Sequence, residues 1–91
     1  MWNPDLLKDR RVLVTAGADG IGLRIASAFH AAGARVLVCD VQQAALDRLA
    51  DTRPGLLGVR ADVAAEDDVA ELFRAVDRQL GGLDVLVNNA G

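Results

Sequence analysis

Three glycines in the segment TAGADGIG, residues 15–22, have the spacing of loops that bind phosphate groups. Gly17, Gly20 and Gly22 would allow a sharp turn, a close approach of a pyrophosphate to the backbone, and tight packing of the following helix on a sheet. The N-terminus of that helix would then offer unpaired N–H groups to the anion. The alternative interpretation is a plain strand-to-helix turn, in which the glycines serve only packing.

Two acidic residues bear on which phosphate-containing ligand such a loop would accept. Asp40 follows the next apolar run, 18 residues after Gly22. A carboxylate there can accept hydrogen bonds from both hydroxyls of an adenine ribose, and it would repel a 2′-phosphate. Asp19, inside the glycine-rich loop, would also raise the energy of an additional phosphate. The two acids therefore predict NAD in preference to NADP. The alternative for Asp40 is a helix-capping role, which is compatible with ribose binding.

The composition of the 91 residues excludes several other chemistries. There is no Tyr, and Lys8, Ser27, His30 and Cys39 are each the only residue of their type. A lone cysteine forms neither an intrachain disulfide nor a Cys-x-x-Cys pair, which favours a reducing, cytoplasmic setting. No apolar run is long enough for a membrane span, no signal peptide is recognisable, and a net charge of −3 gives no basic face. We therefore expect neither a membrane nor a nucleic acid as a partner.

The remaining polar residues are interpreted as structural. His30 is expected at the surface near a helix end, and Cys39 is expected to be a small apolar filler in a buried strand. The consecutive acids at residues 66–68 point in different directions around a helix, so they indicate favourable charge at a helix start rather than a cation site. No catalytic residue and no metal ligand is assigned in this chain.

The elements that must position these residues alternate between short apolar strands and amphipathic helices. Strands are expected at residues 12–15, 36–39, 56–60 and 83–87, and helices at residues 21–32, 42–51 and 65–80. The buried face of the first helix is expected to consist of Ile21, Ile25, Ala28, Phe29 and Ala32. That of the third helix is expected to consist of Val69, Leu72, Phe73, Val76 and Leu80.

This order, β-α-β-α-β-α-β, predicts an α/β fold with a Rossmann-like, doubly wound parallel sheet, as its first half plus the fourth strand. Right-handed crossovers give the strand order 3-2-1-4. We expect residues 1–91 to form a single half domain that is truncated at its C-terminus, because residues 83–87 would be an exposed apolar edge. A longer natural chain is expected to form a homo-oligomer.

Four motifs together resemble the classical short-chain dehydrogenase/reductase family: TAGADGIG at residues 15–22, Asp40, the Asp62-Val63 pair, and NNAG at residues 88–91. The resemblance covers the chain from about residue 7 and implies the N-terminal, cofactor-binding portion of an oxidoreductase. Such enzymes transfer hydride between NAD(H) and an alcohol or ketone. The resemblance implies cofactor contacts at Gly17, Asp19, Gly20, Ile21, Gly22, Asp40, Asp62, Val63, Asn89, Ala90 and Gly91.

The resemblance also identifies what this chain lacks. The catalytic Ser, Tyr and Lys of the family would lie beyond Gly91. Ala16 stands where the family usually has a glycine, which predicts a slightly shifted turn. Ala64 replaces a helix-capping Thr, at a cost of about 1 kcal/mol if nothing else caps the helix.

Two alternative functions stay open at this point. One is a non-catalytic nucleotide-binding or interaction module that ends at Gly91. The other is a Rossmann-like methyltransferase fragment, since an acid after the second strand also suits a ribose there. The NNAG ending speaks against the methyltransferase.

Overall fold

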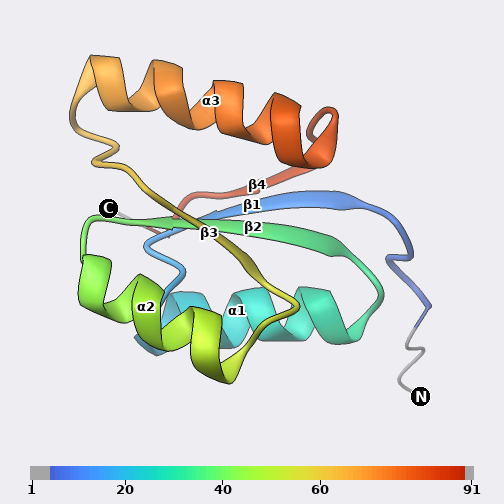
Figure 1. Ribbon diagram of the computed structural model, residues 1–91. Coiled ribbons are helices and arrows are strands. Elements are labelled where there is room, and N and C mark those ends of the chain that lie inside the picture. The colour runs from blue at the N-terminus through green and yellow to red at the C-terminus, as the bar shows by residue number, and fades with distance from the viewer. Residues whose placement is uncertain (1–4, 90–91) are drawn as a thin grey trace.

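The computed structural model describes residues 5–89. Its parallel sheet consists of β1 (Arg11–Thr15), β2 (Arg35–Asp40), β3 (Leu57–Arg60) and β4 (Val85–Val87). Helices α1 (Gly20–Ala31) and α2 (Gln43–Thr52) cover one face of the sheet, and α3 (Glu66–Leu80) covers the other (Figure 1). The strand order is β3-β2-β1-β4, which confirms the predicted Rossmann-like topology.

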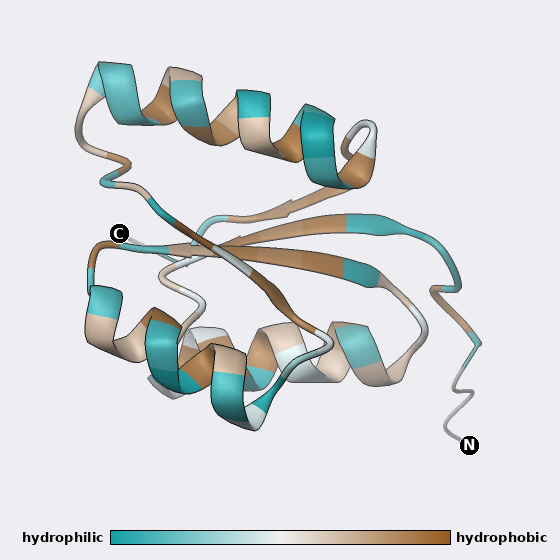
Figure 2. Cartoon of the chain, in the orientation of Figure 1, coloured by the Kyte–Doolittle hydropathy of each residue, from teal (hydrophilic) through white to brown (hydrophobic). Residues whose placement is uncertain are grey.

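The two central strands carry most of the core. β1 and β2 pair in register from Arg11 opposite Arg35 to Thr15 opposite Cys39. Alternate side chains of these strands face the α1–α2 layer or the α3 layer, and both sets are buried. Figure 2 shows the apolar strands between helices whose polar residues lie on the outer sides. A central parallel strand is covered on both faces, which explains why continuous apolar runs were the correct signal.

Helix α1 presents a different face to the sheet from the one that its periodicity predicts. The side chain of Ile21 is 70% exposed, and Ala28 is also exposed, whereas Gly22 and Ala26 are buried. The assignment of Ile21 and Ala28 to the buried face was therefore wrong. The reason lies in the loop: a Cβ atom at Gly22 would collide with the carbonyl oxygen of Ala16, so the helix rests on its glycine side.

Helix α3 follows its predicted apolar stripe with one exception. Its buried residues are Leu72, Ala75, Val76 and Leu80. The side chain of Phe73 is 42% exposed, so its assignment to the buried face was wrong. Phe73 instead lines a groove of about 310 Å³ between α3 and β4, together with the exposed side chains of Val63 and Leu86.

The start of α3 is organised by carboxylates rather than by a capping hydroxyl. The N-cap is Ala65, one residue later than expected, and its side chain makes no capping bond. The Asp62 carboxylate accepts the N–H of Ala64 at 2.9 Å, and the Asp68 carboxylate accepts the N–H of Asp62 at 2.8 Å. These bonds order the turn that leads into the helix, but they do not satisfy the N–H groups of its first turn, so no side chain among the described residues replaces the missing cap.

Strand β4 is shorter than the expected run at residues 83–87. The Asp84 carboxylate accepts the backbone N–H of Arg11 at 2.9 Å and its side-chain Nε–H at 3.0 Å. Because Asp84 takes the Arg11 amide, the regular pairing with β1 begins only at Val85, opposite Val12. The hydrogen bond from the Arg11 side chain is also the main reason why the pKa of Asp84 falls to about 2.

Within residues 5–89, no helix has both the length and the apolar character needed to cross a membrane.

Candidate nucleotide-binding site

The expected site residues gather at one edge of the sheet. The loops after β1, β2, β3 and β4 all emerge at the carboxyl ends of these parallel strands. Ligands of open α/β sheets bind in the crevice outside such strand ends. Every expected site residue from Gly17 to Asn89 lies in or beside these loops, whereas Ala90 and Gly91 lie outside the described residues.

Glycine is favoured at each of the three loop positions for a different structural reason. A Cβ at Gly17 would lie 2.7 Å from the Cβ of Val38, so this glycine allows the loop to pack against β2. At Gly22, a Cβ would collide with the Ala16 carbonyl and lie 2.8 Å from the side-chain nitrogen of Asn89. Gly20, by contrast, has a left-handed backbone (φ 56°) and open space beside its Cα. Gly20 is therefore the glycine that leaves room for a ligand.

Ala16 adopts a backbone conformation that is typical of the glycine it replaces. Its φ is 52°, in the left-handed region that glycine adopts most readily. Such a conformation costs a residue with a Cβ roughly 1–2 kcal/mol. The turn therefore keeps a left-handed residue at position 16, and the alanine is tolerated with some strain.

The first turn of α1 has donors that the protein does not use. The Asp19 carboxylate accepts the N–H of Gly20 at 2.8 Å, and the Asp19 carbonyl accepts the N–H of Leu23 at 3.1 Å. Among the described residues, no acceptor is found for the backbone N–H groups of Ile21 and Gly22. Two unpaired amides and the positive end of the helix dipole favour an anion here.

Asp19 does not stand alone as a negative charge. The side chain of Arg48, from α2, places its Nη2 atom 3.9 Å from the Asp19 carboxylate. Both side chains are largely exposed, so the pair is weak. The acid therefore still acts on any ligand that approaches the loop, although Arg48 partly offsets its charge.

Asp40 joins the ends of β1 and β2. One oxygen of its carboxylate accepts the N–H of Ala18 at 3.2 Å, and the other accepts the N–H of Gln42 at 3.1 Å. The N-cap residue of α2 is Gln42 rather than Asp40, so the capping alternative does not hold in its direct form. A carboxylate offers about four lone pairs, so a bond at each oxygen leaves acceptor capacity on both.

Three of the expected residues meet in a single pocket. The pocket has a volume of about 130 Å³ and is lined by Ala16, Cys39, Asp40, Val41, Ala61, Asp62 and Val63. One oxygen of Asp62 accepts the N–H of Ala64, and the described residues offer no acceptor for the N–H of Val63. The pocket therefore combines partly exposed valine side chains with a carboxylate that keeps free lone pairs and a backbone donor without a partner among the described residues.

Thr15 is the main residue that sequence reasoning missed. Its hydroxyl accepts the N–H of Asn89 at 2.9 Å and donates toward the side-chain oxygen of Asn88 at 3.2 Å and the Val87 carbonyl at 3.4 Å. The side-chain Nδ2 of Asn89 also donates to the Ala16 carbonyl at 3.4 Å. Thr15 thus ties the segment after β4 to the glycine-rich loop. The only sequence signal was a lone hydroxyl at the end of an apolar strand.

The other polar residues are placed as expected. His30 is exposed in the last turn of α1, and Cys39 is buried in β2. Burial raises the pKa of the Cys39 thiol, which makes it a poor nucleophile. The acids at residues 66–68 form the first turn of α3. Between residues 5 and 89, no group of three or more His, Cys, Asp or Glu side chains is arranged to hold a metal ion.

Comparison with known proteins gives a consistent match. A family model described as short chain dehydrogenase matches residues 10–91. An uncharacterized oxidoreductase of Mycobacterium bovis is 46% identical over 89 residues, which cover 94% of this chain and 36% of the relative. Galactitol 2-dehydrogenase of Agrobacterium fabrum is 40% identical over 85 residues, which cover 92% of this chain and 33% of the relative.

A solved structure agrees with the sequence comparison. The crystal structure of a short chain dehydrogenase from Bacillus anthracis superimposes with a TM-score of 0.83 at 29% identity, covering 94% of this chain and 36% of that one. The chain thus spans about a third of the length of these relatives. The alternative of a non-catalytic module is not favoured. The chain belongs to the short-chain dehydrogenase family, of which it forms the NAD(P)-binding portion.

Proposed function

We propose that residues 1–91 are the NAD-binding half domain of a longer oxidoreductase, which transfers hydride between NAD(H) and an alcohol or ketone. When bound, the nicotinamide supplies the hydride chemistry, and this part of the chain binds and orients the dinucleotide. Galactitol 2-dehydrogenase and 3-beta-hydroxysteroid dehydrogenase, both relatives at 40% identity or more, act on alcohols by their names. The substrate of the longer protein would be recognised by residues other than residues 1–91.

The pyrophosphate would bind at the first turn of α1. The N–H groups of Ile21 and Gly22 have no acceptor among the described residues and lie at the positive end of the helix dipole, which supports this placement because such groups attract an anion. The open space beside Gly20 supports a close approach of the phosphates to the backbone. Asn89 donates its backbone N–H to Thr15, and this bond would hold the segment after β4 in place beside the nicotinamide ribose. We place Ala90 and Gly91 in the same path.

The adenosine would bind at the ends of β2 and β3. The adenine ring would lie in the 130 Å³ pocket, with Asp62 accepting from its exocyclic amine and the Val63 N–H donating to a ring nitrogen. The Asp40 carboxylate would accept the two ribose hydroxyls with its remaining lone pairs. A 2′-phosphate in this position would meet the charge of Asp40, which supports NAD in preference to NADP.

The observation that carries this proposal is the anchored carboxylate of Asp40, and its substitution tests the cofactor preference. Asp40→Asn keeps the shape of the side chain and one acceptor oxygen but removes the charge. We expect the ratio of the NADPH and NADH dissociation constants of the full-length protein to fall by about tenfold. Fluorescence titration with each reduced cofactor would measure both constants.

A matched control separates the local effect from a general change in charge. Asp47→Asn removes the charge of an exposed carboxylate of α2, which accepts a hydrogen bond from the side chain of Gln43. This variant should leave the ratio of the two dissociation constants unchanged. An unchanged ratio in Asp40→Asn would contradict the role of Asp40, whereas failure of the unmodified protein to bind either dinucleotide would refute the proposal as a whole.

Three further parts of the proposal concern the natural protein. The apolar groove beside β4, with Leu86 51% exposed, supports a longer chain whose next segment covers this face. We propose a homo-oligomer for that longer chain, and size-exclusion chromatography with light scattering would test it. The single buried cysteine supports a reducing, cytoplasmic location.

A further inference from the structure

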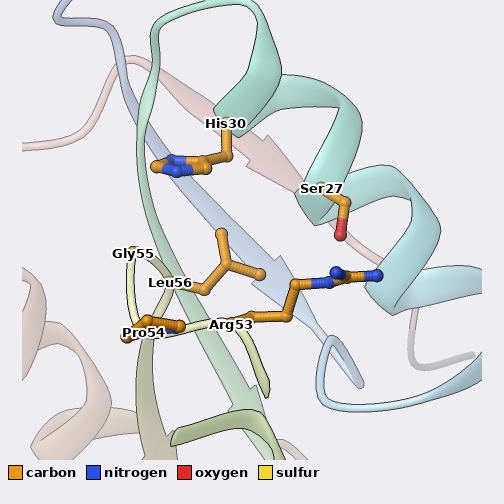
Figure 3. A pocket seen from close by; sticks show the side chains of 6 residues that line it. All are labelled: Ser27, His30, Arg53, Pro54, Gly55 and Leu56. Atoms are coloured by element: carbon orange, nitrogen blue, oxygen red, sulfur yellow. The ribbon is translucent and has the colours of Figure 1, made fainter. Parts of the chain in front are cut away.

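A second cavity lies at the opposite end of α1 from the glycine-rich loop. It has a volume of about 370 Å³ and lies between the last turns of α1 and the turn that joins α2 to β3 (Figure 3). Its lining residues are Ser27, His30, Arg53, Pro54, Gly55 and Leu56. Ser27 and His30 are three residues apart on α1, so they share one side of the helix. The buried Leu56 provides an apolar floor.

The Ser27 hydroxyl is buried and has no hydrogen-bond partner among residues 5–89. A serine within a helix commonly donates to the carbonyl one turn back, and Ser27 does not. Figure 3 shows its oxygen directed toward the guanidinium group of Arg53, across the cavity. A buried hydroxyl without a partner is unfavourable, so an acceptor brought to this position by a bound group would stabilise the cavity.

Two donor side chains of exposed residues, His30 and Arg53, lie at the same cavity and also have no hydrogen-bond partner within residues 5–89. Arg53 makes no ion pair and no side-chain hydrogen bond within the described part of the chain. The ring of His30 lies against Gly55, where an added Cβ would stand 2.6 Å from its Nε2 atom. In Figure 3 the His30 ring lies above Leu56, and the Arg53 guanidinium lies to its right, below Ser27. No carboxylate lines the cavity.

We propose that this cavity binds a phosphate group, either as free phosphate or as the head of a small phosphomonoester. Each polar side chain that lines it can donate a hydrogen bond, and a phosphate oxygen accepts such bonds. The Arg53 guanidinium has the planar donor geometry that matches two phosphate oxygens, and the Ser27 hydroxyl gains the acceptor that the chain does not give it. An ester group would rest on Leu56 and Pro54.

This site is separate from the nucleotide-binding site. His30 is ten residues from Gly20 on the same helix, which corresponds to about 15 Å along the axis. The two sites also use different features: the first turn of α1 offers backbone amides, whereas the second cavity offers side chains from α1 and from the turn before β3. A phosphate at the second cavity is therefore not part of the dinucleotide.

The test measures binding of inorganic phosphate and of glycerol 2-phosphate to the full-length protein at constant ionic strength. We expect calorimetry to show binding, and amide NMR signals of Ser27, His30 and Gly55 to shift. Arg53→Gln should weaken binding by about tenfold, because a charge-assisted hydrogen bond is lost. Ser27→Ala should also weaken it, by a smaller factor. Arg78→Gln, an exposed arginine of α3 on the other face of the sheet, is the matched control.

The outcomes separate the possibilities. Tighter binding of glycerol 2-phosphate would support a phosphomonoester as the ligand, and equal or weaker binding would support free phosphate. Binding of neither probe would overturn the proposal, and the Ser27 hydroxyl would then be satisfied by water. Equal weakening by Arg78→Gln, or shifts confined to residues 17–22, would also overturn it. None of these results depends on whether the protein binds NAD.

Discussion

Replacement of Thr15 by Val would test whether one buried hydroxyl holds the site together. Thr15 is 4% exposed, and valine has the same shape without the hydroxyl. The change removes the acceptor of the Asn89 N–H at 2.9 Å and the donor to Asn88 at 3.2 Å. A part-buried amide left without an acceptor costs about 1–3 kcal/mol, and the lost donated bond adds about 1 kcal/mol.

The added methyl group offsets part of this loss. Burial of a methyl-sized group in place of a hydroxyl contributes about 0.8 kcal/mol of stabilisation. We therefore expect Thr15→Val to lower the free energy of unfolding by about 2 kcal/mol. The backbone N–H of Asn89 should also lose protection against hydrogen exchange, because it no longer donates to Thr15. Urea unfolding and exchange followed by NMR would measure the two effects.

Two controls make the result interpretable. Thr52→Val removes an exposed hydroxyl that donates to the Arg48 carbonyl at 2.8 Å in the last turn of α2, and it should change stability by less than about 0.5 kcal/mol. Thr15→Ser keeps the hydroxyl, so it should keep the protection of Asn89 despite the loss of a methyl group. A loss below about 0.5 kcal/mol in Thr15→Val, with Asn89 still protected, would refute the assigned role of the hydroxyl.

Gly22→Ala should cost about 3 kcal/mol in urea unfolding, since its Cβ meets the Ala16 carbonyl, whereas Gly20→Ala should cost about 1 kcal/mol for its left-handed backbone. Equal costs would contradict the geometry of the loop. Ala16→Gly should raise the free energy of unfolding by up to about 1 kcal/mol, as relief of strain exceeds the added freedom of the unfolded chain. Because the pKa of Asp84 is lowered to about 2 by Arg11, its stabilising contribution is present above the unfolded pKa and is lost as the pH falls toward 2. Asp84→Asn should therefore flatten the pH dependence of stability between about pH 4 and 2, and an unchanged acid limb would count against the pair.

The sheet could be predicted because its central strands carry an unambiguous pattern. Residues 12–15 and 36–39 are continuously apolar, which indicates burial on both faces, and right-handed crossovers then allow one strand order. The ends of the elements were less predictable. The short β4 depends on the bond between Asp84 and the Arg11 amide, which joins residues 73 positions apart.

The orientation of α1 was not predictable from hydropathy. Its contact face is built on Gly22 and Ala26, which are too small to dominate a hydrophobic pattern, while the large side chain of Ile21 points outward. The phase of the helix is instead set by the close approach of Gly22 to the Ala16 carbonyl. When a helix packs through small residues, a hydropathy scale gives those residues little weight, so the buried face cannot be identified from the hydrophobic pattern.

The acidic residues of the candidate site were singled out from the sequence, but the backbone amides that they bind could not be predicted from it. Asp40 holds the amides of Ala18 and Gln42, Asp62 holds that of Ala64, and Asp19 holds that of Gly20. Each carboxylate thus orders the loop that would present it to a ligand.

Carboxylates that order a loop and would also bind the ligand affect the free energy of binding in two ways. Loops that are fixed before the ligand arrives pay less conformational entropy on binding, so the structural bonds of these acids also favour affinity. Substitution of Asp40 by Ala would therefore remove the proposed ligand contact and loosen the loop at Ala18 at the same time. A structural role and a ligand-binding role are then not alternatives, and only shape-conserving changes such as Asp40→Asn, read through the ratio of two cofactors, separate the charge from the scaffold.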